Sequence, residues 1–205
     1  MNSRKSFQKI ITRMYPETAN SILLEMDTQY LHISKDTNFS RNSINPIDKR
    51  LDFTAYFLAL IQTLRARGFN FDQIRIICLD ITYDYVRPKN VFQKWLKRLP
   101  PKFFNTILAN VLIKLLNKKV NRKGHVDGFL AKIVTKKEET YGLGYGVDIL
   151  ECGICKLFIK HKAEEYSSIL CEVDKLTSGL AGLELIRTGT IANGAEKCDF
   201  RFKKK

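Results

Sequence analysis

The hydrophobic pattern of this chain changes its period once, near Gly124, and this change constrains the fold more than any other feature. Upstream, apolar residues recur at three- and four-residue steps, which is typical of helices that pack through one face. Downstream, apolar and polar residues alternate in short runs bounded by turn residues, which is typical of half-buried strands. The sequence therefore predicts an α+β fold, with a helical N-terminal half followed by an antiparallel sheet with an inserted helix.

Four segments upstream of Gly124 are predicted to be helical. They are residues 7–33, a segment that Asp48 or Asp52 caps and that ends near Arg67, residues 71–86, and residues 102–119. Pro16 interrupts or starts a helix in the first segment, because proline lacks the N–H that a helix interior needs. Residues 34–47 are polar and turn-rich and are predicted to form a loop. Residues 71–86 also fit a strand pair, but their apolar spacing favours a helix.

The clearest helical signal lies in residues 102–119. Apolar side chains form one stripe of this segment, while asparagines and lysines lie on the other faces. The stripe consists of Phe103, Phe104, Ile107, Leu108, Val111, Leu112, Leu115 and Leu116. Two interpretations are open. The helix packs against its own domain, which is the commoner arrangement, or it lies at the interface of a membrane.

Two pairs of strands are predicted downstream of Gly124. They are residues 129–136 with 145–152, and residues 183–192 with 197–202. A polar turn at residues 137–144 joins the first pair, and Asn193-Gly194 is a strong hairpin signal in the second. A helix at about residues 164–180 lies between the pairs. We expect the helical region, 1–124, and the motif-bearing α+β region, 125–205, to pack together as one domain.

The composition is that of a globular protein with a large positive charge. Hydrophobic residues make up 44% of the 205 residues, which is enough for a core. No segment has the apolar length of a membrane span, and no secretion signal is visible. The five cysteines are an odd number, and nothing suggests export, so we expect a cytoplasmic protein with reduced thiols.

The net charge of +14 fits several kinds of partner. Nucleic acid, an anionic membrane surface and anionic substrates are all attracted by such a charge, and a lysine-rich solvated surface is the simpler explanation. No motif for reading bases is found, so we expect no specific nucleic-acid partner. Peripheral contact with an anionic surface stays open, and the oligomeric state is not predicted.

Four of the five cysteines lie between Tyr145 and Phe202. Cys152 and Cys155 have the spacing of zinc ligands and redox pairs, but Cys171 and Cys198 lack a paired spacing. Buried structural thiols are therefore favoured over a zinc site. We expect neither a metal nor a cofactor.

The last predicted strand separates two sets of side chains. Cys198, Phe200 and Phe202 share one face. If the Asn193-Gly194 turn has two or four residues, the opposite face carries Thr188, Thr190, Asp199 and Arg201. An Asp–Arg pair alone is ordinary in a sheet, but two neighbouring threonines favour the wall of a polar pocket.

The predicted inserted helix has a second stripe beside its core face. Cys171, Asp174 and Ser178 form this stripe at three- and four-residue spacing. A solvated face is one interpretation. In the other interpretation, the thiol and the carboxylate face a cleft, which is favoured because cysteine is uncommon on exposed faces.

Three motifs carry a family resemblance. They are Glu-Cys-x-x-Cys-Lys-Leu-Phe from Glu151, Leu-Cys-x-x-Asp from Leu170, and Arg-Thr-x-Thr-Ile-Ala-x-Gly-Ala-x-x-Cys-Asp-Phe-Arg-Phe from Arg187. Over about residues 141–202 the chain resembles the L-2-amino-thiazoline-4-carboxylic acid hydrolase family. The cysteine- and glycine-containing ending also resembles 4-vinyl-reductase-type small-ligand-binding domains, which bears on fold more than on activity.

The first resemblance implies hydrolytic ring opening of a small carboxylate substrate. By residue type, Cys171 or Cys152 suits the nucleophile and Asp174 or Asp199 suits the acid or base. Candidates for substrate binding are Arg187, Thr190, Asn193 and Arg201, with an arginine on the substrate carboxylate. The second resemblance implies instead a non-catalytic ligand-binding or sensing module. A third possibility is an anionic-surface binder that uses the basic helical half.

Overall fold

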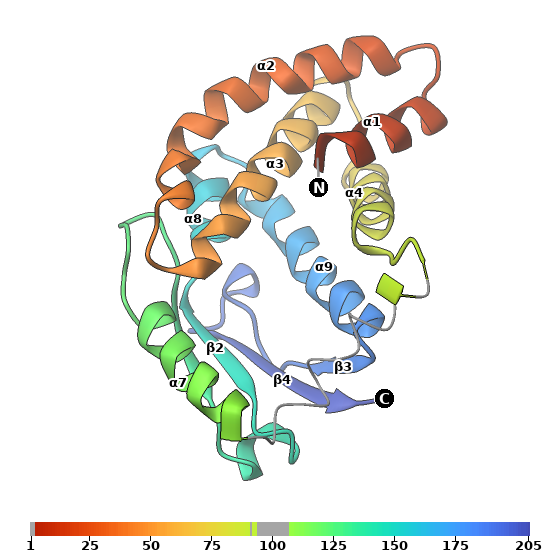
Figure 1. Ribbon diagram of the computed structural model, residues 1–205. Helices are drawn as coiled ribbons and strands as arrows, with labels where there is room; N and C mark the ends of the chain where they lie inside the picture. Colours follow the sequence, from red (N-terminus) through yellow and green to blue (C-terminus); the bar gives the residue numbers. More distant parts are fainter. Residues whose placement is uncertain (1–2, 91, 94–106) are drawn as a thin grey trace.

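The computed structural model of the protein describes residues 3–90, 92–93 and 107–205, and it has the predicted α+β architecture (Figure 1). Helices fill the N-terminal half, and a four-stranded antiparallel sheet follows. The α-helices of the described residues are α1 (Ser3–Met14), α2 (Ala19–Thr37), α3 (Arg50–Ala66), α4 (Phe71–Val86), α7 (Ile107–Val120), α8 (Gly153–Lys160) and α9 (Ser167–Leu180). Residues 71–86 are thus a helix, as their spacing predicts.

The sheet contains the four predicted strands in the order β1-β2-β4-β3. Their bounds are β1 (Leu130–Val134), β2 (Gly146–Glu151), β3 (Leu183–Ile186) and β4 (Cys198–Lys204). Val147 pairs with Phe200 and Ile149 pairs with Cys198, so these four side chains share one face. Asp148 and Asp199 pair on the other face.

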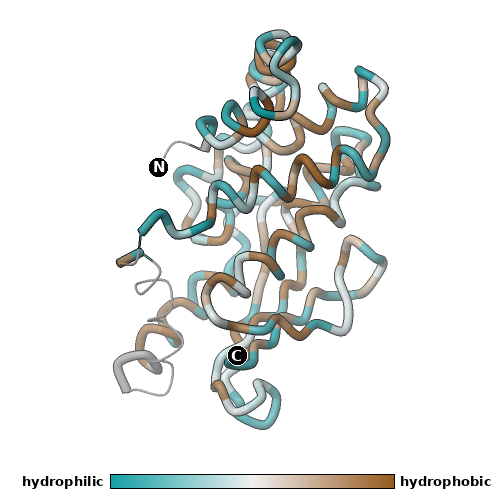
Figure 2. The backbone as a smooth tube through the Cα atoms, turned by 90° about the vertical axis from the view of Figure 1, so that its right-hand side faces the viewer, coloured by the Kyte–Doolittle hydropathy of each residue, from teal (hydrophilic) through white to brown (hydrophobic). Residues whose placement is uncertain are grey.

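The helices cover the face of the sheet that carries Cys198. In Figure 1, α9 lies between the sheet and the layer formed by α3 and α4. Helix α3 is the centre of the core, because Leu58, Leu60 and Ile61 have no exposed surface. One hydrophobic cluster extends from Phe7 in α1 to Cys198 in β4. Figure 2 shows the hydrophobic stretches, in brown, running through the middle of the molecule.

Two buried polar residues before α3 connect the helical half to the sheet. The side-chain amide of Asn45 donates to the carbonyl oxygens of Phe129, at 2.8 Å, and Val120, at 3.3 Å. A carboxylate oxygen of Asp48 accepts the Phe129 N–H at 2.7 Å. Neither Asp48 nor Asp52 caps α3 as predicted, because the N-cap residue is Lys49, which makes no side-chain capping bond. Asn45 caps the short 3₁₀ helix Pro46–Lys49.

Residues 34–47 are not the irregular loop that their polar composition predicts. Helix α2 continues to Thr37, and a 3₁₀ helix, Asn38–Arg41, follows it directly. The ring of Phe39 stacks on His125 with ring centroids 3.9 Å apart. This long-range contact, which composition cannot show, holds the segment in place.

The predicted hairpin at Asn193-Gly194 is wrong, and strand β3 ends six residues earlier than predicted, at Ile186. The backbone N–H groups of Thr188 and Gly189 donate to the side chain of Asp199, so they do not continue a strand ladder. Asn193 is the last residue of a 3₁₀ turn, Ile191–Asn193, which Gly194 caps with a φ of 84°. β3 and β4 still pair, but through a long connection.

Helix α7 begins at Ile107 in the described part of the chain, and Phe103 and Phe104 of the predicted stripe lie outside the described residues. Val111, Leu112 and Leu115 are 50%, 57% and 57% exposed, so these stripe residues do not pack into the core. Among all described helices, none is both long and apolar enough to cross a membrane.

Candidate functional site

One cavity contains all four cysteines of the C-terminal region. It lies between α9, the start of α8, the start of α3 and the covered face of the sheet. Its polar lining consists of Arg50, Cys152, Cys155, Ser167, Cys171, Asp174, Arg187 and Cys198. Apolar side chains such as Phe129, Ile149 and Phe200 complete the wall. The predicted cleft on the Cys171 and Asp174 side of the inserted helix is therefore present.

Local structure explains how each thiol reaches this cavity. Cys152 is the N-cap residue of α8, and Cys155 lies in the first turn of the same helix. Cys171 and Asp174 are three residues apart on α9, so both project from one face. Cys198 begins β4 on the face that strand parity predicts.

Asp174 lies between two arginines from opposite ends of the chain. Its Oδ1 is 2.6 Å from Nη2 of Arg50, the first residue of α3. Its Oδ2 is 3.7 Å from Nη1 of Arg187, which directly follows β3. The negative charge of Asp174 raises the pKa of the Arg50 guanidinium against the opposing effect of burial. Through these ion pairs, Asp174 holds two cationic side chains, Arg50 and Arg187, at the cavity.

Arg187 is the cationic side chain with the most restricted environment in the cavity. Its side chain is only 7% exposed, its Nη2 donates to the Cys171 carbonyl at 3.2 Å, and its guanidinium carbon lies 5.1 Å from the Phe200 ring centroid. Within the described part of the chain, Nη1 of Arg187 has no hydrogen-bond partner. A buried donor without an acceptor is costly, so this atom is suited to bind an oxygen of an anionic ligand.

The thiols of the cavity differ in their tendency to ionise. A shared hydrogen bond with Cys152 lowers the pKa of Cys155, and the same hydrogen bond together with burial raises the pKa of Cys152. Burial raises the pKa of Cys171 to about 11, although Arg187 opposes this. Burial also raises the pKa of Cys198. Cys155 is therefore the thiol that most readily becomes a thiolate.

The cysteines do not form a metal-binding group in the part of the chain that is described. There, no set of three or more histidine, cysteine, aspartate or glutamate side chains could hold an ion. Cys152, Cys155, Cys171 and Cys198 are all free thiols.

The predicted site residues on the other face of β4 lie outside this cavity. Asp199 accepts the N–H groups of Thr188 and Gly189 and the Thr188 hydroxyl, at 2.7 to 3.1 Å. Arg201 pairs with Asp148 at 2.8 Å. These contacts place both side chains away from Cys171, because alternate residues of a strand face opposite ways.

Thr190 and Asn193 also do not line the cavity among the residues described for it. Thr190 is buried, and its carbonyl accepts the N–H groups of Asn193 and Ala195. Asn193 is exposed on the 3₁₀ turn. The structure therefore brings together Cys152, Cys171, Asp174 and Arg187, but not Thr190, Asn193, Asp199 or Arg201.

Four polar residues of the cavity were not predicted for catalysis or binding: Arg50, Cys155, Ser167 and Cys198. Arg50 is 124 residues before Asp174 and carries no local signal, so sequence spacing could not find it. Cys155 was noted only as a possible metal or redox ligand. Its position three residues after the N-cap was a usable signal, because helix N-termini favour thiolates.

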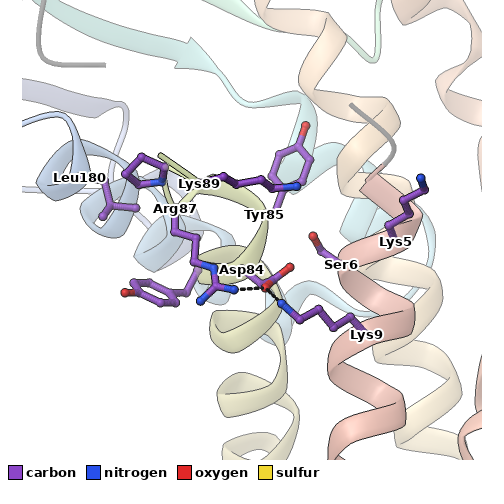
Figure 3. A pocket seen from close by; sticks show the side chains of 10 residues that line it. Lys5, Ser6, Lys9, Asp84, Tyr85, Arg87, Lys89 and Leu180 are labelled. Atoms are coloured by element: carbon purple, nitrogen blue, oxygen red, sulfur yellow. Dashed lines mark hydrogen bonds and ion pairs between the residues drawn. The ribbon is translucent and has the colours of Figure 1, made fainter. Parts of the chain in front are cut away.

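A larger groove lies elsewhere among the described residues, between α1 and the end of α4 (Figure 3). It encloses about 1010 Å³, whereas the thiol cavity encloses about 30 Å³. Lys5, Lys9, Arg87 and Lys89 line this groove, and Figure 3 shows Lys9 and Arg87 converging on Asp84. Its described lining contains no thiol, so we place the candidate site in the smaller cavity.

The fold and the cavity define an α+β protein with a site that combines four thiols with two arginines, of which Arg187 is buried. The model of the family described as L-2-amino-thiazoline-4-carboxylic acid hydrolase matches residues 49–202, and the chain belongs to this family. The match extends well upstream of the three sequence motifs and includes α3 with Arg50. No curated protein and no solved structure matches the chain.

Proposed function

We propose that this protein hydrolyses the ring of 2-amino-thiazoline-4-carboxylate, or of a related cyclic amidine or thioether, to give N-carbamoyl-cysteine or its analogue. The observation that carries the proposal is the buried Nη1 of Arg187, which has no hydrogen-bond partner among the described residues and only a 3.7 Å ion-pair contact with Asp174, in a cavity with four thiols. A carboxylate ligand would satisfy this donor through a charge-assisted hydrogen bond. The family to which the chain belongs supports the same substrate class.

The reaction requires attack on the ring carbon that lies between sulfur and nitrogen. Water adds to this carbon, the carbon–sulfur bond breaks, and the departing sulfur takes a proton, so that one water yields a carbamoyl group and a free thiol. In the covalent route, an enzyme thiolate adds first and expels the ring sulfur. Water then displaces the enzyme sulfur from the same carbon. Both routes need a base or nucleophile, a proton donor and a cation for the carboxylate.

The cavity residues suit these roles unequally. The lowered pKa of Cys155 favours it as the nucleophile or as the base that activates water. Cys171, with a pKa of about 11, stays protonated at neutral pH, which suits a proton donor for the ring sulfur better than a nucleophile. Asp174, between Arg50 and Arg187, suits a positioning role for the two guanidinium groups.

Turnover by matched variants tests this proposal. Wild-type protein should convert 2-amino-thiazoline-4-carboxylate with release of one thiol per substrate, which a thiol reagent measures. We expect Arg187→Gln to lower kcat/KM by about a hundredfold or more, the scale of a lost charged contact to the substrate. Arg201→Gln removes an arginine that lies outside the cavity and pairs with Asp148, and this variant should retain most activity.

Single substitutions in the same assay distinguish the roles of the individual thiols. Cys155→Ser should abolish turnover if this thiolate is the nucleophile or base, and Cys171→Ser should lower it less. Full activity of Arg187→Gln, or no turnover by wild type at stoichiometric enzyme concentration, would contradict the proposal.

A non-catalytic ligand-binding module is the second candidate. It is favoured by the raised pKa values of Cys152, Cys171 and Cys198, which leave three of the four thiols protonated. The cavity volume of about 30 Å³ holds roughly two water molecules, so any ligand must shift side chains on binding. Saturable binding of the thiazoline carboxylate without thiol release would identify this function.

A further inference from the structure

Helix α7 presents an apolar face that the described part of the chain leaves uncovered. Val111, Leu112, Leu115 and Leu116 are 50%, 57%, 57% and 36% exposed. At 100° per residue these four side chains fall within an arc of about 140°, which also contains Lys119. Contiguous exposed aliphatic side chains of this kind mark interaction surfaces rather than ordinary solvated helices. We propose that this α7 face docks onto the surface of an anionic lipid bilayer.

The opposite side of α7 is anchored, so the apolar face cannot turn inward. Ile113 and Val120 are 6% and 2% exposed and belong to the hydrophobic core. The side-chain oxygen of Asn117 accepts the backbone N–H of Ile133 in β1 at 2.8 Å. These contacts set the rotation of the helix about its axis. The exposure of Leu112 and Leu115 is therefore a property of the folded molecule.

The charged side chains of α7 itself are all positive. Lys114, Lys118 and Lys119 are exposed on the same helix, and α7 contains no acidic residue. From α7 to residue 126, residues 107–126 contain five lysines and arginines and no aspartate or glutamate. Exposed leucines next to lysines are typical of helices that lie in the interface of anionic membranes.

Charge also decides between a bilayer and the other occupants of such a face. In a symmetric dimer through α7, the three lysines of one copy would lie close to the three of the other, and this repulsion disfavours a second copy. Nucleic acid would use the lysines but leave the aliphatic side chains exposed to water. An anionic bilayer accepts both groups, the leucines among the acyl chains and the lysines at the headgroups.

Vesicle co-sedimentation of the full chain tests the proposal. Vesicles of phosphatidylcholine alone are compared with vesicles that also contain phosphatidylserine, at low and high salt. We expect binding only to the anionic vesicles, and weaker binding at high salt. Leu112→Gln with Leu115→Gln, and separately Lys114→Gln with Lys118→Gln and Lys119→Gln, should each weaken binding by at least about tenfold.

A matched control uses a second helix with exposed leucines. Leu24 and Leu31 of α2 are 70% and 67% exposed, and their replacement by glutamine should leave vesicle binding unchanged. Circular dichroism of each variant checks that the fold is intact, which is expected because all substituted side chains are exposed. Three results would each overturn the proposal: α7 variants that bind anionic vesicles as well as wild type does, wild type that binds neutral vesicles as well as anionic ones, or no vesicle binding at all.

Two further outcomes would assign the face to another occupant and also overturn it. Size-exclusion chromatography with light scattering would detect a dimer that the double leucine substitution dissociates. Displacement of the protein from anionic vesicles by duplex DNA, with the leucine variants binding DNA as well as wild type, would indicate a nucleic-acid surface.

Discussion

Asp48 has no solvent-exposed surface, yet both of its carboxylate oxygens accept hydrogen bonds. One accepts the backbone N–H of Phe129 at 2.7 Å, and the other accepts the hydroxyl of Ser43. A Cβ atom added at Gly128 would lie 2.8 Å from Asp48 Oδ1, so the glycine is required by this close approach. This single carboxylate joins residues 81 positions apart and fixes where β1 begins.

Replacing Asp48 should destabilise the protein strongly. Asp48→Ala leaves the Phe129 N–H and the Ser43 hydroxyl without their acceptor in a buried place, so we expect a loss of about 2–3 kcal/mol in the free energy of unfolding. Urea denaturation followed by circular dichroism measures it. Glu17→Ala, at an exposed position, should change stability by less than about 0.5 kcal/mol. A loss below about 1 kcal/mol for Asp48→Ala would show that the contact is dispensable.

The ionisation of the cavity thiols predicts two different pH profiles of alkylation. Because the pKa of Cys171 is about 11, its rate of reaction with iodoacetamide should rise about tenfold per pH unit through pH 10 or so. The pKa of Cys155 is lowered, so its rate should level off at a lower pH. Mass spectrometry of labelled peptides gives both profiles from one sample. Profiles of the same shape would refute the ranking.

At the scale of single elements, α4 has the best-defined start of the helices described. The Asn70 side chain accepts the backbone N–H of Gln73 at 2.9 Å, and the Gln73 side chain accepts the N–H of Asn70 at 2.9 Å. This reciprocal pair is a capping box, which satisfies two donors that a helix otherwise leaves unbonded. Helix α2 provides a contrast, because its N-cap residue Thr18 makes no side-chain capping bond.

The two helix starts allow a matched comparison. Asn70→Ala should lower the free energy of unfolding by about 1 kcal/mol, because it removes the acceptor of the Gln73 N–H. Thr18→Ala removes a side chain with no capping role and should have a clearly smaller effect. Thermal unfolding of the two variants and the wild type provides the measurement. Equal effects would mean that the capping box contributes nothing beyond residue propensity.

At the scale of the whole molecule, carboxylates with lowered pKa values connect separate segments. The Lys123 and Lys156 side chains lower the pKa of Glu151. Burial alone would raise the pKa of Asp199, but the donors of Gly189 and Thr188 outweigh it and the pKa is lowered. The pKa of Asp148 is lowered in the same way by Lys197 and Arg201. A carboxylate with a lower pKa in the folded state stabilises the fold above its unfolded pKa.

The protein should therefore lose stability in acid. The contribution of these groups is complete above about pH 4–5 and is lost as the pH falls through their lower folded pKa values. Asp199→Asn should be less stable than wild type at about pH 7 and closer to wild type at about pH 2, because it no longer titrates. Urea unfolding at a series of pH values tests this. A constant difference between the two proteins at all pH values would contradict the assignment.

Local spacing was sufficient to predict part of the site. The three-residue separation of Cys171 and Asp174 predicts that both face one cleft, and the cavity confirms it. Strand parity likewise separates Cys198 from Asp199. The predicted neighbourhood of Thr188 and Asp199 is present, since the Thr188 hydroxyl donates to Asp199 at 2.7 Å. The predicted strand does not reach Thr188, because the Asp199 side chain captures the N–H groups of Thr188 and Gly189. A side chain that competes with the backbone ladder is not visible in a hydrophobic pattern.

The sequence by itself determined the type of most long helices and strands, but not the helical segment at 34–41, helix α8 or the end of β3. Helix and strand faces follow from periods of a few residues along the chain. The sequence also carried the motifs that identify the family. Only the tertiary structure decided which faces meet. Arg50 reaches Asp174 across 124 residues, and Asp48 reaches Phe129 across 81, because hydrogen bonds and ion pairs of this kind depend on how α3, α9 and the sheet pack together. No local period encodes such a contact.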